Sequence, residues 1–274
     1  MVGHEADPSH PRYASLLRRA MLEDASAKGM LAASALIAHG RGEAFDYLLG
    51  EVTTATALEA TTEAAARLSE AVRPVISING NVAALAADDL IRCSALLDCP
   101  LEINIFYRTP ERMTALLEHM SERKAAVADS PAPIGWQGDG EQSWAEAVND
   151  VSILGDEPNA TIPGLEGPRA KCHREGILDS DVILVPLEDG DRCEALVAMG
   201  KDVLVVDLNP LSRSAKMGNV TIVDELTRFC ANLLATLITG APAVNREWDN
   251  LANLKSSLDE IYKNISRTDS SPGS

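Results

Sequence analysis

Four short polar stretches each follow an apolar run that predicts a β-strand, and their residue types could bind a small molecule. They are residues 77–81, 106–109, 187–192 and 207–214. In an open parallel sheet, backbone amides and helix amino termini converge at the carboxyl ends of the strands, which makes this edge the ligand crevice. Because polar residues and small turn formers gather at several such ends, the sequence predicts a small-molecule site there.

These stretches need a sheet to bring them together, and the apolar pattern supplies one. It predicts an α/β fold in which helices flank a Rossmann-like, mostly parallel sheet, preceded by a helical N-terminal part. The expected strands are residues 75–79, 101–107, 182–187, 202–208 and 220–223. The expected helices are residues 11–28, 30–38, 54–71, 82–97, 110–128, 192–199, 227–239 and 248–265.

The expected organisation is one α/β domain over residues 1–265. It divides into the helical N-terminal part, residues 1–73, and the sheet-containing part, residues 74–265. Residues 129–140 and 155–174 carry little periodicity and are expected to be surface loops, and residues 266–274 are expected to form a disordered polar tail.

Composition limits the possible partners. The formal net charge is −17, which opposes long-range attraction to nucleic acid or to an anionic membrane, so neither is an expected partner. No apolar run approaches the roughly 18 residues of a membrane span. The five cysteines show no Cys-x-x-Cys spacing and are expected to be reduced thiols. These features together predict a soluble, cytoplasmic protein.

The familiar nucleotide and hydrolase motifs are missing from the sequence. It contains neither a Gly-x-x-x-x-Gly-Lys-Ser/Thr loop nor a Gly-x-Ser-x-Gly elbow. The run Gly40-Arg41-Gly42 begins like a dinucleotide fingerprint, but the third glycine is absent and no expected strand precedes it. A NAD-dependent oxidoreductase is therefore disfavoured.

Two segments have residue types suited to phosphate. In a turn between two glycines, Arg41 could approach a polyphosphate closely, or could form a surface ion pair. Residues 189–192 follow a strand and open a helix, so their amides could receive phosphate while Asp189 or Asp191 holds a ribose hydroxyl or Mg²⁺. The alternative for this second segment is an ordinary helix cap.

Other candidates have equally plain structural alternatives. Asn79 and Asn81 flank Gly80 in a sequence suited to positive φ, and could hold an acid substrate or simply form a tight turn. His39 could carry a proton, or be structural. Arg19 could be no more than part of a solvated helix face.

A set of motifs in this order resembles the archaeal 4-phosphopantoate--beta-alanine ligase family, also called phosphopantothenate synthetases. The motifs are residues 10–13, 36–48, 79–81, 162–166, 187–192 and 206–214. The resemblance extends over roughly residues 8–260, with an insertion relative to the family around residues 130–144.

The resemblance implies an ATP-dependent ligase of coenzyme A biosynthesis. Such an enzyme condenses (R)-4-phosphopantoate with β-alanine through an acyl adenylate, and releases 4′-phosphopantothenate, AMP and diphosphate. ATP as co-substrate, Mg²⁺ and a homodimer follow by the same analogy. The alternative that remains open is a non-catalytic nucleotide-binding regulatory protein that uses the same site.

The resemblance also carries roles over to individual positions. It implies catalytic roles for Arg19, Arg41 and His39, and substrate binding by Asn79, Gly80 and Asn81. No residue is assigned as a dedicated metal ligand. The positions expected to bind the nucleotide are Arg19, Arg41, Glu188, Asp189, Gly190, Asp191, Arg192, Asp207, Leu208, Asn209, Pro210, Leu211, Ser212 and Arg213.

Overall fold

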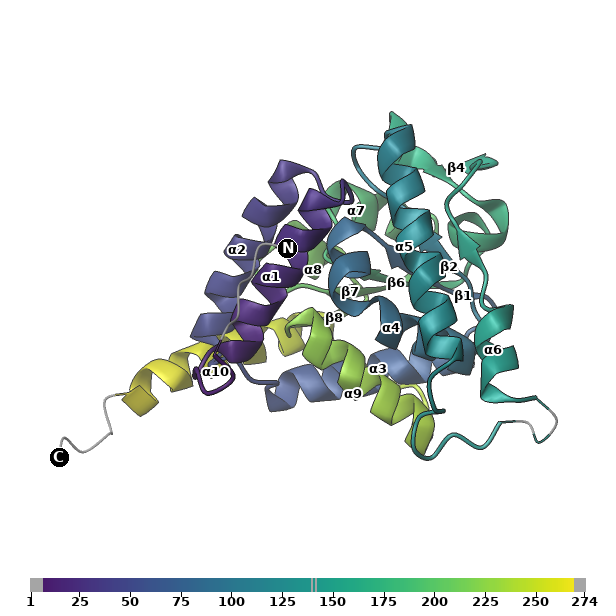
Figure 1. Ribbon diagram of the computed structural model, residues 1–274. Coiled ribbons are helices and arrows are strands. Elements are labelled where there is room, and N and C mark those ends of the chain that lie inside the picture. Colours follow the sequence, from purple (N-terminus) through teal and green to yellow (C-terminus); the bar gives the residue numbers. More distant parts are fainter. Residues whose placement is uncertain (1–6, 139, 141, 269–274) are drawn as a thin grey trace.

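The computed structural model describes residues 7–138, 140 and 142–268, and it is an α/β fold (Figure 1). The α-helices are α1 (Tyr13–Ala27), α2 (Ala33–Leu48), α3 (Ala55–Glu70), α4 (Gly80–Leu97), α5 (Pro110–Ala128), α6 (Trp144–Asp150), α7 (Gly190–Ala198), α8 (Arg213–Met217), α9 (Leu226–Thr239) and α10 (Asn250–Thr268). The strands are β1 (Pro74–Ile78), β2 (Leu101–Ile103), β3 (Ile153–Leu154), β4 (Ala160–Thr161), β5 (Lys171–Cys172), β6 (Val182–Pro186), β7 (Asp202–Val206) and β8 (Val220–Ile222).

Six of the strands form one sheet in the order β3-β2-β1-β6-β7-β8, and all neighbouring pairs are parallel. Ile76 of β1 pairs with Leu101 of β2 on one side and with Leu184 of β6 on the other. The chain builds outward from β1 in one direction and from β6 in the other, so the strand order reverses between them. Such a reversal opens a crevice at the carboxyl ends of the two strands. The predicted Rossmann-like parallel sheet is confirmed.

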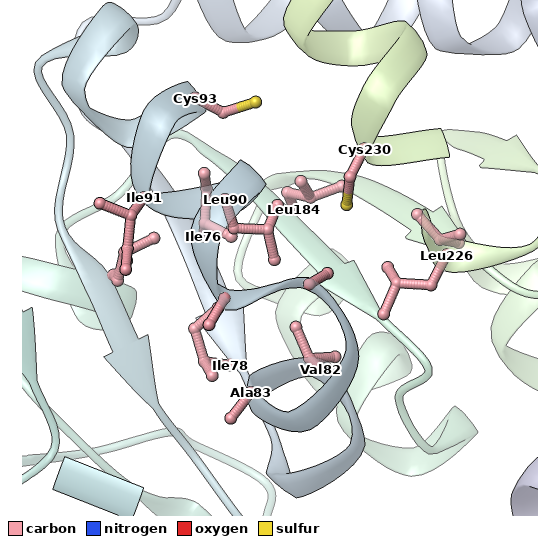
Figure 2. Close-up of a cluster of buried hydrophobic side chains, with 14 of the residues drawn as sticks. Ile76, Ile78, Val82, Ala83, Leu90, Ile91, Cys93, Leu184, Leu226 and Cys230 are labelled. Atoms are coloured by element: carbon pink, nitrogen blue, oxygen red, sulfur yellow. The ribbon is translucent and has the colours of Figure 1, made fainter. Parts of the chain in front are cut away.

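The larger core lies on the sheet face covered by α3, α4, α5 and α9. Figure 2 shows its centre, where Ile76 and Ile78 of β1 meet Val82 and Leu90 of α4. Leu184, Leu226 and Cys230 close the same cluster from β6 and α9. The opposite face holds a smaller cluster of Ile183, Val185, Val203 and Val205 with Leu196 of α7. Because both faces are covered, the strands are apolar throughout rather than alternating.

A third apolar cluster places α2 and α10 beside the ends of β7 and β8. Leu49 follows the end of α2. It packs with Leu208 after β7, with Val223 after β8 and with Leu254 of α10. Gly42 of α2 approaches so closely that a Cβ there would lie 3.5 Å from the Leu208 side chain. This packing positions α2 over the carboxyl edge of the sheet, and Figure 1 shows α1 beside it.

The glycine turn predicted around Arg41 is wrong. α2 is one continuous helix from Ala33 to Leu48, and Gly40, Arg41 and Gly42 lie inside it. Helix contacts with Leu208 and with distant charged residues outweigh the cost of the two glycines, which is about 1 kcal/mol each. Arg41 is therefore presented by a helix, not by a flexible loop.

The positive φ predicted for the Asn79-Gly80-Asn81 segment is also wrong. The only described non-glycine residues with positive φ are Glu51, Asp98, Glu157 and Leu187, and Gly80 is absent from the described glycines with positive φ. Asn79 is instead the N-cap of α4, and its side chain accepts a hydrogen bond from the Val82 amide at 3.1 Å. Glycine is needed at position 80 because a Cβ would lie 2.8 Å from the Leu31 side chain.

The sequence did not predict the elements between α5 and β6. The segment expected to be a loop over residues 155–174 contains the β4–β5 hairpin and the 3₁₀ turn η1 (Pro168–Ala170), and the π-helix η2 (Arg174–Leu178) begins at its end. β2 ends at Ile103 rather than continuing to residue 107. α10 runs to Thr268, three residues past the expected helix end at residue 265, and residues 269–274 of the expected tail lie outside the described part. No described helix is long and apolar enough to cross a membrane.

Candidate active site

A cavity of about 730 Å³ lies at the carboxyl edge of the sheet. Its walls are α2, the first turns of α4, α7 and α8, the segments that follow β6 and β7, and the start of α9. Eleven of the predicted site residues line it: His39, Arg41, Asn81, Glu188, Asp189, Gly190, Asp207, Leu208, Asn209, Ser212 and Arg213. The structure therefore gathers three of the four predicted polar stretches into one hollow, and none of residues 106–109 lines it.

Seven other predicted site residues do not line this cavity. They are Arg19, Asn79, Gly80, Asp191, Arg192, Pro210 and Leu211. The Arg19 side chain is 45% exposed and pairs with Glu43 at 2.8 Å, and Glu43 is a lining residue. Asp191 is held between Arg169 and Arg213. Leu211 is exposed and Pro210 is buried.

Two helices begin side by side in the cavity wall. Asp189 is the N-cap of α7 and accepts from the Arg192 amide at 2.9 Å, while Ser212 caps α8 and accepts from the Ala215 amide at 3.0 Å. Their close approach depends on Gly190, because a Cβ at this position would lie 2.5 Å from Cβ of Arg213. Free amides of a first helical turn attract anions, so this wall suits phosphate.

Asp207 orders the loop between β7 and α8. Its carboxylate accepts from the Ser212 hydroxyl at 2.5 Å and from the Asn209 amide at 2.9 Å. Burial raises the pKa of Asp207 above its ordinary value, and these two hydrogen bonds oppose the rise. Burial likewise raises the pKa of Glu188, against the nearby charge of Arg192. Both carboxyl groups thus lie in parts of the cavity wall that are largely shielded from water.

The α2 wall combines a free cation with a desolvated imidazole. Arg41 is exposed, and no carboxylate of the described residues lies within ion-pair distance of it. His39 Nε2 is buried without a hydrogen-bond partner in the described part of the chain. Burial lowers the pKa of His39 below 6.5, and the charges of Glu43 and Glu225 only partly oppose this. His39 is therefore neutral near pH 7 and able to accept a proton.

The sequence reasoning missed a charged network beneath the cavity. Arg18 of α1 lies 3.5 Å from Asp46 of α2 and 3.3 Å from Glu225, the N-cap of α9. Arg228 joins the same Asp46 from α9 at 2.5 Å. All of these groups except Arg228 line the cavity. No local motif marks them, because they come from three separate helices; a pair of adjacent arginines in α1 was the only available signal.

The point where the strand order reverses carries backbone strain. Leu187, directly after β6, has φ +54°, a conformation that costs a non-glycine residue about 1 to 3 kcal/mol. Asn79 at the end of β1 bridges to this segment, donating from Nδ2 to the carbonyls of Pro186 and Leu187 at 3.1 Å each. Leu187 itself lines the cavity. Strain retained at a cavity wall is typical of functional sites.

The described residues contain no group of three or more His, Cys, Asp or Glu side chains placed to hold a metal ion. Most carboxylates of the cavity are already engaged: Glu43 by Arg19, Asp46 by Arg18 and Arg228, and Asp207 by Ser212. Any divalent ion here would need ligands from a bound substrate as well.

Comparison with known proteins gives concordant results. The family model described as phosphopantothenate/pantothenate synthetase matches residues 56–132 and 142–264. The interruption falls within the segment around residues 130–144 that was predicted to be an insertion.

Curated relatives agree with the family match. The chain is 48% identical over 220 residues to the 4-phosphopantoate--beta-alanine ligase of Thermococcus kodakarensis, covering 80% of this chain and 75% of that protein. It is 39% identical over 264 residues to the ligase of the same name from Methanospirillum hungatei, covering 94% and 96% of the two chains. A third relative of that name, from Methanosarcina mazei, is 38% identical over 270 residues, covering 93% of this chain and 94% of the relative.

Proposed function

The chain belongs to the phosphopantothenate/pantothenate synthetase family, and on that premise we propose that it is an ATP-dependent 4-phosphopantoate--beta-alanine ligase of coenzyme A biosynthesis. The relatives that carry this name cover most of the chain, and the family model covers the starts of α7 and α8 in the cavity wall. The observation that carries the proposal is the pair of helix starts at Gly190 and Arg213 in a cavity at the strand reversal.

The proposed reaction has two steps. A carboxylate oxygen of phosphopantoate attacks the α-phosphorus of ATP, which forms the acyl adenylate and expels diphosphate. The amine of β-alanine then attacks the acyl carbon, loses a proton, and expels AMP. Negative charge builds on phosphoryl oxygens in the first step and on an acyl oxygen in the second, so fixed donors around these atoms lower both barriers.

In this proposal the nucleotide binds between α2 and the starts of α7 and α8. Arg41 is the free cation on this wall and supplies charge to the polyphosphate. The first-turn amides of α7 donate hydrogen bonds to a phosphate, as in other helix-terminus sites. Asn209 and Ser212 add hydrogen-bonding groups, and Arg213 adds a cation at the start of α8. Arg19 acts from the edge through Glu43, which it contacts at 2.8 Å.

Mg²⁺ fits this cavity as a companion of ATP. It is usually held by one or two carboxylates together with substrate phosphates and waters, which matches a site lacking a complete set of protein ligands. Of the two expected carboxylates, Asp189 lines the cavity and would be the one to supply the ligand, since Asp191 lies outside the lining. The ion would contribute charge neutralisation on the phosphates.

His39 is the proposed acceptor of the proton that β-alanine loses. Its imidazole is neutral near pH 7 because burial lowers its pKa. Its Nε2 atom lies in the cavity wall without another partner among the described side chains. Asn79, Gly80 and Asn81 are the proposed contacts to the acid substrate at the start of α4.

The remaining expectations form part of the same proposal. A homodimer is supported by large apolar side chains exposed on α1 and α2, namely Leu17, Ile37 and Tyr47. One domain over residues 1–265 is supported by a core that α1 shares with the sheet. A cytoplasmic location follows from the use of ATP.

The test is AMP and diphosphate release from the purified protein with ATP, Mg²⁺, phosphopantoate and β-alanine, each omitted in turn. Release of AMP only when both acids are present is the expected result. ATP binding without turnover in the complete mixture would favour the non-catalytic regulatory protein instead. Release of ADP in place of AMP would contradict the adenylate route.

A further inference from the structure

Two arginine side chains bridge the same pair of segments beside the cavity, one inside the other. The inner bridge is Arg192 of α7, whose Nη1 donates to Oδ1 of Asn104 just after β2. The outer bridge is Arg169, whose guanidinium stacks 5.2 Å from the ring centre of Phe106 and pairs with Asp191 at 3.1 Å. Both bridges therefore join the end of β2 to the start of α7.

Arg192 is the largest fully buried side chain of the described residues, and its hydrogen-bonding capacity is not used up. The residue is 1% exposed, yet its Nε and Nη2 atoms have no hydrogen-bond partner in the described part of the chain. Its ion pair with Glu188 is long, at 3.5 Å. Leaving buried donors of a cation unpaired is costly, so such a group calls for a partner that the protein does not itself supply.

The unpaired donors are held in place rather than loose. Asn104 donates from Nδ2 to the Lys171 carbonyl at 2.9 Å, which fixes its oxygen toward Arg192. The backbone of Asn104 is tied to β1 through the Ile78 carbonyl at 2.8 Å. This arrangement orients the guanidinium in advance of any ligand, as anion sites require.

The position of this group complements the nucleotide cavity. The strand order reverses between β1 and β6, and the cavity occupies the β6–β7 side together with α2. Arg192 is absent from the cavity lining and faces Asn104 on the β1–β2 side. In sheets of this order a two-part ligand spans both sides of the reversal. The β1–β2 side is thus the place where this sheet order would put the second reactant of an acyl transfer to or from a nucleotide.

Another cation raises the local positive charge. Arg108 follows Phe106 by two residues, and its Nη2 donates only to the Gly155 carbonyl. None of the described carboxylates lies within ion-pair distance of Arg108. Burial lowers the pKa of Arg108, and the charges of Glu102 and Asp156 partly oppose this. In a chain of net charge −17 such a cation is unusual.

Resting on the proposed ligase function, we propose that Arg192 and Arg169 bind the phosphate of a phosphorylated hydroxy-acid substrate on the β1–β2 side of the reversal. A phosphate dianion offers three acceptor oxygens to the two guanidinium forks. In this proposal the phosphate replaces Asp189 and Asp191 beside Arg169. The Phe106 ring next to Arg169 is 52% exposed and is free to move aside. Arg192 is then a substrate residue rather than the nucleotide residue that the sequence resemblance implied.

The experiment is calorimetric titration of wild-type protein and variants with 4-phosphopantoate, with pantoate, and separately with ATP and Mg²⁺. The variants are Arg192→Gln and Arg169→Gln. Arg169 is 22% exposed, so its replacement leaves the fold intact even where Arg192→Gln does not. Arg246→Gln is the matched control, since the one ion pair of Arg246 among the described residues is with Glu70 and its side chain is 79% exposed.

We expect the Kd for 4-phosphopantoate to rise about tenfold or more in Arg169→Gln, while the Kd for ATP stays within about twofold. The Kd for pantoate, which lacks the phosphate, should be equal in wild type and Arg169→Gln. Unchanged phosphopantoate binding, or a loss confined to ATP, overturns the phosphate subsite. Failure of the wild-type protein itself to bind 4-phosphopantoate would instead count against the ligase function.

Discussion

The two edges of the sheet use the same kinds of charged residue in opposite ways. At the amino edge, Arg67 of α3 donates to Glu63 at 2.7 Å and to Asp202 of β7 at 2.9 Å. Lys201, just before β7, donates to the carbonyls of Leu178 and Ser180. Asp181, just before β6, accepts from the amides of residues 72, 73 and 182. All of these charged groups are paired, and their contacts join helices, strands and loops to one another.

At the carboxyl edge, polar groups of the same kinds keep hydrogen-bonding atoms or charges that no described residue pairs. His39 Nε2, Asn81 Oδ1 and Arg192 Nε are buried without partners in the described structure. Arg41 has no counter-ion there, and Leu187 holds a strained φ. Native proteins leave few buried polar groups unpaired, and those that remain call for a specific explanation. The amino edge stabilises the fold, and the carboxyl edge is available for ligands.

The largest expected effect comes from Gly190→Ala at the carboxyl edge. A Cβ at position 190 would lie 2.5 Å from Cβ of Arg213, so the starts of α7 and α8 must move apart. Because both starts form the proposed phosphate wall, kcat/KM for ATP should fall about a hundredfold or more, as for other misplaced active-site groups. Steady-state kinetics measures this. Gly40→Ala is a control at a helical glycine outside the cavity lining, where nothing lies within 4 Å of the new Cβ.

Arg67→Ala should show the opposite profile at the amino edge. It leaves Glu63 and the half-buried Asp202 without their cation, which should lower the free energy of unfolding by about 2 to 3 kcal/mol. The KM for ATP should not change, because Arg67 is far along the strands from the cavity. Urea denaturation measures the loss of stability, and Arg246→Ala, an exposed pair, should cost less than about 0.5 kcal/mol. An altered KM would remove the distinction between the two edges.

His39→Gln should change the pH profile of turnover. Burial holds the pKa of His39 below 6.5, so the proton-accepting form prevails at neutral pH and is lost as the pH falls through that lowered pKa. Wild-type kcat should therefore decline on the acid side, while the variant should be about tenfold to a hundredfold slower and lack this limb. His119 also has a pKa lowered by burial but lies outside the cavity, so His119→Gln should keep the limb.

The same lowered pKa affects stability. Below about pH 6.5 the unfolded chain binds a proton at His39 that the folded state resists, so stability should fall as the pH drops from about 6.5 toward the lower folded pKa and should level off beneath it. The part of this acid dependence that comes from His39 should be missing in His39→Gln, as measured by urea unfolding at several pH values.

The smallest expected effect is a gain. Gly40 lies inside α2 and nothing lies within 4 Å of a Cβ built there, so Gly40→Ala should raise the free energy of unfolding by about 0.5 to 1 kcal/mol. Destabilisation would instead support the glycine turn that the sequence suggested. Thermal unfolding distinguishes the two.

The sequence was sufficient for the parallel sheet and for the start of α7. Strands buried on both faces are continuous apolar runs, and Asp189 has the residue type and position of a helix cap. The helical course of α2 could not be predicted locally, because it depends on Asp46 meeting Arg18 and Arg228 from other helices. The direction in which the Arg192 side chain points could not be predicted for a similar reason, because its partner Asn104 is 88 positions away in the sequence.

The central claim is that the carboxyl edge binds the nucleotide through Arg41, and calorimetric titration with ATP and Mg²⁺ tests it most directly. The account predicts one ATP per wild-type chain, a Kd about tenfold higher or more for Arg41→Gln, and a wild-type Kd for Arg246→Gln. Equal ATP affinity in wild type and Arg41→Gln would contradict the assignment of this edge to the nucleotide.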